Sequence, residues 1–316
     1  MQRIEGIENI HTPLTRAVLT IGNFDGVHLG HQRLFERVIE TAKQINGTPV
    51  AITFEPHPMK VLQPDGCPFP LITLYDQKME LLSQVGLDVL IVVQFNHEFA
   101  QISAHQFVQD ILVNRIGLQS IIIGNDYCFG KKREGNIQLL QQYGDKLGFE
   151  VQIVPWVDHQ SQTRISSTAI RTAVASGNLD QAKKMLGRYY QVRGTVQHGR
   201  HRGGHLVGFP TANIKLVDEL KPLNGVYAVD VQLQDKHHQG VANIGYSPTF
   251  DDHQYTLEIH LLDFSGDLYD KTIRVNFIER LRGEKKFESI DALSAQINQD
   301  IHNARKIFET LQVLSQ

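Results

Sequence analysis

A glycine-rich turn near the N-terminus, Ile21-Gly-Asn-Phe-Asp-Gly-Val-His-Leu-Gly-His31, constrains the fold more than any other stretch. It follows the apolar run 17–21, which is typical of a buried strand, and precedes residues 32–40, whose apolar side chains repeat at helical spacing. A turn between a strand and a helix offers backbone N–H groups and the positive end of a helix dipole to an anion. His28 and His31 would share one face of the first helical turn. The stretch therefore predicts a phosphate site, although paired histidines could also cap a helix or bind a metal.

The N-terminal half alternates short apolar runs with amphipathic segments, a pattern typical of a doubly wound parallel sheet. The expected strands are residues 18–21, 50–53, 89–93, 121–123 and 151–154, and the expected helices are 32–44, 74–85 and 105–116. Thr73 with Asp76, and Ser103 with Gln106, have the spacing of capping boxes at two helix starts. We therefore expect a Rossmann-like α/β domain that binds ligands at the carboxyl ends of its strands.

Three further motifs follow expected strands, and each has a plainer interpretation beside the functional one. Thr53-Phe-Glu-Pro-His-Pro58 is a stiff loop that would aim His57 at the ligand, or a rigid turn with a solvated histidine. Residues 124–135 carry three glycines and three consecutive cations, which suit a mobile loop over phosphates or a solvated basic loop. Residues 164–171 contain three consecutive hydroxyl side chains, which suit a phosphate site or an ordinary helix cap. Motifs at four successive strand ends favour the phosphate-site interpretation.

The pattern changes near residue 187, where short strands with period-two alternation begin. The expected strands are 190–196, 226–233, 241–244, 255–262 and 273–277, which predict a small antiparallel β-barrel. A C-terminal helix is expected after a Ser289 cap, with an apolar stripe that packs on the barrel: Ile290, Leu293, Ile297, Ile301, Ala304, Phe308 and Leu311. We place the two domains at residues 1–186 and 187–316.

Glu258 is the acidic residue of the second half that is best placed for chemistry. It lies on the opposite strand face from Leu257 and Ile259, beside His260 on its own face. A carboxylate there could accept the proton of a substrate hydroxyl. A glutamate that simply faces water would show the same alternation, so the residue pattern alone leaves both interpretations open.

The four N-terminal motifs together resemble the FMN adenylyltransferase module of the bacterial bifunctional riboflavin kinase/FAD synthetase family. The resemblance implies that His28 and His31 act as catalytic residues on the ATP phosphates. It implies an ATP site formed by Gly22, Phe24, Asp25, Gly26, His28, Gly30, His31, Ser166, Ser167, Thr168 and Arg171. It implies a flavin site formed by Phe54, Pro56, His57, Pro58, Asn125, Asp126 and Phe129.

A second glycine-rich string, residues 194–213, resembles the riboflavin kinase signature of the same family. The resemblance implies an ATP site formed by Gly199, Gly203, Gly204, Gly208, Pro210, Thr211 and Asn213, with Thr211 and Asn213 also holding Mg²⁺. It makes Glu258 the general base of the kinase. One departure is His205, which stands where the family usually has arginine. This change would weaken a phosphate contact or shift it to Arg200 or Arg202.

The resemblance implies a bifunctional enzyme of FAD biosynthesis. The C-terminal barrel would phosphorylate riboflavin to FMN with ATP, and the N-terminal domain would transfer AMP from ATP to FMN, with Mg²⁺ in both steps. Three alternatives stay open at this point. The chain could be an FMN adenylyltransferase with a flavin-binding but inactive kinase domain. It could be a flavin-sensing binding protein, or another H-x-G-H nucleotidylyltransferase with an unrelated barrel.

Charge and hydropathy indicate which partners and which cellular compartment to expect. The net charge is −3 and the basic tract 131–133 is the longest, so no nucleic-acid partner is expected. No apolar run is long enough to span a bilayer, and the first residues lack the apolar core of a signal peptide. We therefore expect a cytoplasmic protein without a membrane partner, with Cys67 and Cys128 as free thiols, that is a monomer or a weak homo-oligomer.

Overall fold

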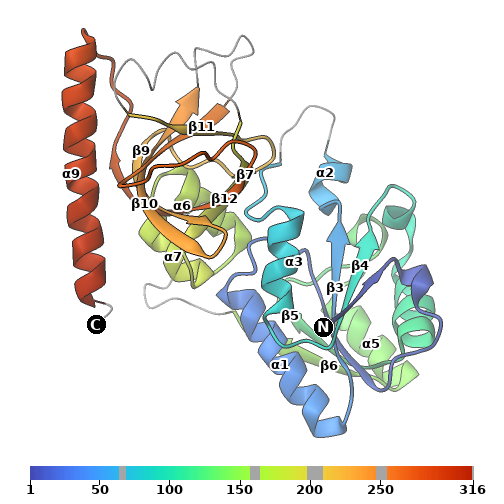
Figure 1. Ribbon diagram of the computed structural model, residues 1–316. Coiled ribbons are helices and arrows are strands. Elements are labelled where there is room, and N and C mark those ends of the chain that lie inside the picture. The colour runs from blue at the N-terminus through green and yellow to red at the C-terminus, as the bar shows by residue number, and fades with distance from the viewer. Residues whose placement is uncertain (64–68, 157–163, 198–208, 247–254, 315–316) are drawn as a thin grey trace. The chain divides into compact units, whose positions relative to one another are not determined.

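The computed structural model describes residues 1–63, 69–156, 164–197, 209–246 and 255–314 (Figure 1). The chain divides into two compact units, Met1–Ser167 and Thr168–Gln316. This division places the segment 168–186 with the second unit. The predicted limit of the functional domains at residues 186 and 187 stays a prediction. In the described residues, no helix combines the length and apolar character needed to cross a bilayer.

The first unit contains a six-stranded parallel sheet with the strand order β1-β4-β3-β2-β5-β6, which confirms the predicted doubly wound fold. Its strands are β1 (Gln2–Glu5), β2 (Ala17–Ile21), β3 (Pro49–Glu55), β4 (Val89–Gln94), β5 (Leu118–Gly124) and β6 (Glu150–Val154). Its helices are α1 (Leu29–Ile45), α2 (Pro58–Leu62), α3 (Tyr75–Ser83), α4 (Ala104–Gln106), the π-helical η3 (Phe107–Ile116) and α5 (Ile137–Leu147). Single 3₁₀ turns are η1 (Ile7–Asn9), η2 (Phe99–Gln101) and η4 (Lys131–Arg133).

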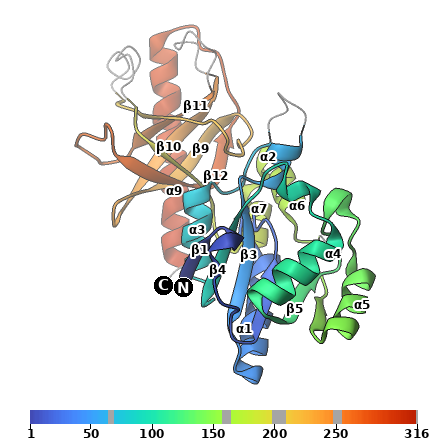
Figure 2. The ribbon, with the colours of Figure 1, turned by 90° about the vertical axis from the view of Figure 1, so that its right-hand side faces the viewer.

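Helices cover both faces of this sheet (Figure 2). In β2, Leu19 and Ile21 point to the side of η3 and α5, whereas Val18 points to the side of α1 and α3. All five residues of β2 are buried, and all but Thr20 are apolar, because a central parallel strand is covered on both sides. This explains why the apolar run was visible in the sequence.

The predicted helix starts give one confirmation and one correction. Ser103 and Gln106 form the expected capping box, with side-chain to backbone bonds in both directions. The predicted box of Thr73 and Asp76 is wrong, because α3 begins after Leu74 without a side-chain cap. The hydroxyl of Thr73 is bonded instead to the turn that follows β2.

The second unit contains a six-stranded antiparallel sheet with the order β7-β12-β9-β10-β11-β8. Its strands are β7 (Tyr190–Thr195), β8 (Ala212–Lys215), β9 (Gly225–Leu233), β10 (Lys236–Tyr246), β11 (Tyr255–Leu261) and β12 (Thr272–Arg282). Its helices are α6 (Ser167–Ala175, of which the first residue falls in the first unit), α7 (Leu179–Leu186) and α9 (Ile290–Leu314). A bridge between Gln197 and Asn213 brings the two edges together, so the sheet is a nearly closed barrel, as predicted.

Helix α9 packs on the outer face of β9 and β10. Ala304 and Phe308 join a buried cluster with Val226, Ala228 and Val241. The hydroxyl of Ser289 accepts a bond from the backbone N–H of Ala292 at 3.1 Å, which confirms the predicted cap. The predicted apolar stripe is buried or partly buried from Leu293 onward, and only its first residue, Ile290, is exposed, at 56%. A bidentate ion pair of Arg282 in β12 with the buried Asp300 fixes the middle of the helix.

Candidate active sites

Three of the N-terminal motifs lie at the carboxyl ends of the neighbouring strands β3, β2 and β5, and Arg164 and Ser167 of the fourth are bonded to two of these motifs. The chain runs from β2 outward to β3 and β4, and then returns to the other side of β2 to form β5 and β6. The strand order therefore reverses at β2. The carboxyl edge beside such a reversal is where open α/β sheets bind ligands.

The two histidines of the first turn lie at the start of α1. His28 is the N-cap residue, and its Nδ1 accepts the backbone N–H of His31 at 3.3 Å. The two imidazole rings stack with centroids 3.5 Å apart and an interplanar angle of 17°. Acceptance through Nδ1 places the proton of a neutral His28 ring on Nε2, a donor suited to phosphate oxygen. The expectation that the two histidines share one face of the helix start is confirmed.

Gly30 and Phe24 shape the surroundings of these rings. A β-carbon at Gly30 would lie 3.1 Å from the His28 ring, so the close approach of backbone and imidazole favours glycine. Phe24 is buried and packs edge-on against His31 at 5.3 Å between centroids. The buried ring of Phe24 therefore holds His31, and with it the stacked pair of imidazoles, in place.

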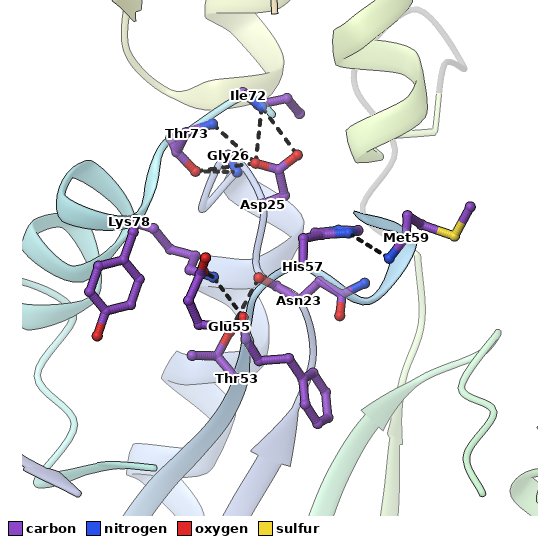
Figure 3. A network of polar contacts seen from close by, with 12 residues as sticks. Asn23, Asp25, Gly26, Thr53, Glu55, His57, Met59, Ile72, Thr73 and Lys78 are labelled. Carbon is purple, nitrogen blue, oxygen red and sulfur yellow. Dashed lines mark hydrogen bonds and ion pairs between the residues drawn. The ribbon is translucent and has the colours of Figure 1, made fainter. Parts of the chain in front are cut away.

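Asp25 is bonded within the protein. Its carboxylate, only 2% exposed, accepts the backbone N–H groups of Ile72 and Thr73, each at 3.0 Å (Figure 3). The Thr73 hydroxyl donates to the same carboxylate and accepts the backbone N–H of Gly26 at 2.9 Å. These bonds attach the turn after β2 to the residues that lead into α3. The predicted contact of Asp25 with ATP stays a prediction.

The loop after β3 is built around a buried histidine. Strand β3 continues to Glu55, a cis peptide bond joins Glu55 to Pro56, and His57 caps α2 by accepting the backbone N–H of Met59 at 3.1 Å. The His57 ring is 5% exposed and stacks on Phe69. The plain alternative of a solvated histidine is therefore wrong.

Lys78 of α3 is a buried cation beneath this loop that sequence reasoning missed. Its Nζ donates to the carbonyl oxygen of Phe54 at 3.1 Å and to Oε2 of Glu55 at 3.3 Å. Burial lowers the pKa of Lys78, and the Glu55 carboxylate opposes that shift. The sequence gives one indication that Lys78 is buried: it precedes Leu82 by four residues and so lies on the apolar face of α3.

Aromatic side chains cluster at the ends of β3, β4 and β5. Phe54 lies 5.7 Å from Phe95 and 6.0 Å from Phe99, measured between ring centroids. The row continues through Phe107 to Phe129, which stacks on Tyr127. Phe107 and Phe129 are buried in the core, whereas Phe54, Phe95 and Phe99 are partly exposed and suit a flat aromatic ligand. The sequence motifs contain Phe54 and Phe129, but the rings between them lie outside any motif.

The basic loop after β5 forms a closed turn. Phe129 and Gly135 exchange two backbone hydrogen bonds, at 2.9 and 3.1 Å. Glu134 accepts the backbone N–H of Ala104 at 2.7 Å and so attaches the turn to α4. Asn125 and Asp126 are exposed, and Asp126 pairs with Arg164 at 2.7 Å. This ion pair joins the loop after β5 to the motif after β6.

The motif 164–171 is divided between the two units. The hydroxyl of Ser167 donates to the carbonyl oxygen of Asp25 at 3.0 Å, so this end of the motif reaches the first turn. Thr168 and Arg171 lie in α6 within the second unit. Their predicted contacts with ATP, like that of Ser166, stay predictions.

In the barrel, Glu258 stands in the middle of a polar row. Residues directly opposite each other in antiparallel strands share one face, and Glu258 of β11 lies opposite Asn213 of β8 and Asn243 of β10. Thr211 stands two residues before Asn213, and His260 is the next residue of β11 on this face. The row lies on the outer face, because Leu257 and Ile259 fill the interior. Sequence analysis missed Asn243 as a site residue.

Partial burial changes the chemistry of this carboxylate. Glu258 is half-buried, and its burial raises the pKa of the carboxyl group above the ordinary value. Nearby, Nδ1 of His260 lies 2.9 Å from the carbonyl oxygen of Pro210. This bond fixes the chain just before Thr211 and Asn213.

Part of the predicted kinase site lies outside the described residues. This applies to Gly199, Gly203, Gly204 and Gly208, and to His205 with Arg200 and Arg202. Cys67 also lies outside them, whereas Cys128 is an exposed free thiol, as expected.

Fold and sites together define a two-domain transferase. The parallel-sheet unit carries an H-x-G-H turn at its ligand-binding edge, and the barrel carries a carboxylate in a polar row. The family model described as FAD synthetase matches residues 11–169, and the family model described as riboflavin kinase matches residues 186–308. The chain therefore belongs to the family of bifunctional riboflavin kinases/FMN adenylyltransferases.

Relatives with that name match almost the whole chain. The protein of Haemophilus influenzae is 39% identical, over 98% of this chain and 100% of its own. The protein of Escherichia coli is 40% identical, over 98% of both chains. A crystal structure from Streptococcus pneumoniae, described as a macrolide-efflux protein, is 34% identical and superposes with a TM-score of 0.85, over 96% of this chain and 98% of its own.

Proposed function

We propose that the second unit phosphorylates riboflavin to FMN with ATP, and that the first unit transfers AMP from ATP to FMN, giving FAD and pyrophosphate. The observation that carries this proposal is the match of one family model for each reaction to its own half of the chain. An enzyme with a silent kinase or a flavin sensor is not favoured, because relatives that match the whole chain are named for both reactions. An unrelated barrel is excluded by the riboflavin kinase match.

In the kinase reaction, Glu258 accepts the proton of the riboflavin 5′-hydroxyl as that oxygen attacks the γ-phosphorus of ATP. The new oxygen–phosphorus bond forms while the bond from the γ-phosphorus to the bridging oxygen breaks, and ADP leaves with the electron pair. A carboxylate with a raised pKa is a stronger base than an exposed glutamate. Asn213 and Asn243 lie directly opposite Glu258 in the two neighbouring strands.

Thr211 and Asn213 would hold Mg²⁺ together with the phosphates of ATP. Their side-chain oxygens are the hard donors that Mg²⁺ prefers, and the two-residue spacing puts both on the face that carries Glu258. The donor set therefore fits the ion. When bound, Mg²⁺ neutralises negative charge on the phosphates.

In the adenylyl transfer, the phosphate of FMN is already ionised and needs no general base. Its oxygen attacks the α-phosphorus of ATP while the bond to the bridging oxygen breaks, and pyrophosphate leaves with the electron pair. His28 and His31 donate to the phosphates at the N-terminus of α1, where the helix dipole also favours negative charge. The flavin ring lies along the aromatic row that begins at Phe54.

We also propose where the enzyme works and with which partners. The enzyme works in the cytoplasm as a monomer or a weak homo-oligomer, without a nucleic-acid or membrane partner. The net charge of −3 supports the part that concerns nucleic acid.

A product assay tests this proposal. Purified protein is incubated with ATP and Mg²⁺ and with either riboflavin or FMN, and the flavins are separated by chromatography. We expect FAD from both reactions, with FMN as a transient product of the first. FAD from FMN alone would refute the kinase half, and His205→Arg would then be the first variant to assay. No product from either substrate would refute the proposal entirely.

A further inference from the structure

One polar network joins the turn after β2, the end of β3 and helix α3 (Figure 3). At one side, Asp25 holds the backbone of Ile72 and Thr73, which lead into α3. At the other side, Lys78 of α3 holds the last two residues of β3. The segment that leads into α3 is thus bonded to the nucleotide turn, and α3 itself is bonded to the flavin loop; the adenylyl transfer must bring these two places together.

The environment of Lys78 makes these bonds restrictive. Its side chain is 5% exposed, whereas that of Glu55 is 34% exposed. A buried ammonium group is costly unless it keeps its acceptors at bonding distance. The Phe54 carbonyl and the Glu55 carboxylate are therefore held where Nζ can reach both. If either acceptor moved away, the buried ammonium group of Lys78 would lose one of its two hydrogen bonds.

The fixed backbone determines where the Phe54 ring lies. Phe54 carries both the carbonyl bonded by Lys78 and the ring that begins the aromatic row next to Phe95 and Phe99. The same strand end leads directly into Pro56 and His57. A shift of the Phe54 carbonyl would move the ring and the loop together.

We propose that Lys78 is a positioning residue of the adenylyltransferase: it acts through Phe54 and Glu55 to hold the flavin-binding loop in register with the nucleotide turn. The proposal rests on the proposed function of the first unit. Lys78 itself touches neither FMN nor ATP in this account. Its effect is therefore expected mainly on the binding of FMN.

The test is the variant Lys78→Met, which keeps most of the volume of the side chain and removes its charge and donors. We expect the KM for FMN in FAD formation to rise by about tenfold or more, since small misplacements of binding groups have effects of that size. The KM for ATP should change less than twofold, and riboflavin phosphorylation by the same chain should be unchanged. Lys78→Arg should recover part of the loss. The matched control is Lys146→Met, which removes an exposed lysine of α5 and should leave all of these constants unchanged.

The outcomes separate a positioning role from a structural one. A purely structural role would lower kcat through loss of folded enzyme and leave both KM values unchanged, which would overturn the proposal. If Lys78→Met does not fold by circular dichroism, Glu55→Gln gives the second test, because it keeps an acceptor but removes the charge. An unchanged KM for FMN in folded Glu55→Gln would also overturn the proposal. Failure of wild-type protein to make FAD from FMN would instead refute the proposed function.

Discussion

Glu258→Gln is expected to slow the conversion of riboflavin to FMN by about two to four orders of magnitude, the usual contribution of a general base. Glutamine keeps the size of the side chain and an acceptor oxygen, but it cannot take the proton of the 5′-hydroxyl. Conversion of FMN to FAD should be unchanged, because Glu258 is not among the residues proposed for that reaction, most of which lie in the other unit. Chromatography of reactions started from riboflavin and from FMN measures both rates. Equal loss of the two activities at unchanged stability would contradict the division of labour.

The raised pKa of Glu258 adds a pH test to this variant. Only the ionised carboxylate accepts a proton, so the kinase rate should fall as the pH decreases. The midpoint of this fall should lie at a higher pH than an exposed glutamate would give.

The same raised pKa affects stability. A carboxyl group whose pKa is higher in the folded state stabilises the fold below its unfolded pKa, and this contribution disappears as pH rises through the folded pKa. At pH 7 the ionised group therefore opposes folding, and Glu258→Gln should melt at the same temperature as the wild type or higher. A clearly lower Tm at pH 7 would show that Glu258 serves mainly the fold.

The double variant His28→Ala/His31→Ala is expected to accumulate FMN and to form FAD at least about 10²-fold more slowly. Removal of one preorganised donor to developing charge typically costs 10²–10³-fold in rate. Riboflavin phosphorylation should continue at the wild-type rate. The same chromatographic assay, started from riboflavin, shows the accumulation directly.

A second double variant separates catalysis from capping. His28 is the N-cap of α1, and loss of a cap costs about 1 kcal/mol of stability. His28→Asn/His31→Ala retains a good capping side chain and removes both imidazoles. It should be as slow as the double alanine variant and melt higher. Normal FAD output from either double variant would refute the catalytic role of the two histidines.

The sequence predicted the elements whose side chains are apolar on both faces or alternate clearly. Strand β2 is buried in every residue, and β11 alternates buried leucine and isoleucine with polar residues. Strand β1 was missed because it lies at a sheet edge and only Ile4 among its four residues is even partly buried. Strand β8 has only four residues, which is too short to give a strong periodic signal.

The missed parts of the candidate sites depend on contacts between distant segments. Thr73 has the local pattern of a helix cap, but Asp25, 48 residues earlier in the chain, takes its hydroxyl. Asn243 becomes a site residue only through the strand register that sets it opposite Glu258. Lys78 resembles a surface lysine until the fold of α3 against β3 buries it. Local spacing predicted which residue types carry the chemistry, and tertiary structure determined which neighbours position them.

Two labelled forms of ATP give the most direct test of two separate group transfers in one chain. The wild-type protein is incubated with riboflavin and Mg²⁺ and with ATP that carries ³²P at either the γ- or the α-phosphorus. We expect γ-label to enter FMN and to stay in FAD, whereas α-label should enter FAD but never FMN. If riboflavin yields no labelled flavin with either form of ATP, but unlabelled FMN in its place yields α-labelled FAD, only the adenylyl transfer would remain. Label in no flavin from either position would contradict the account.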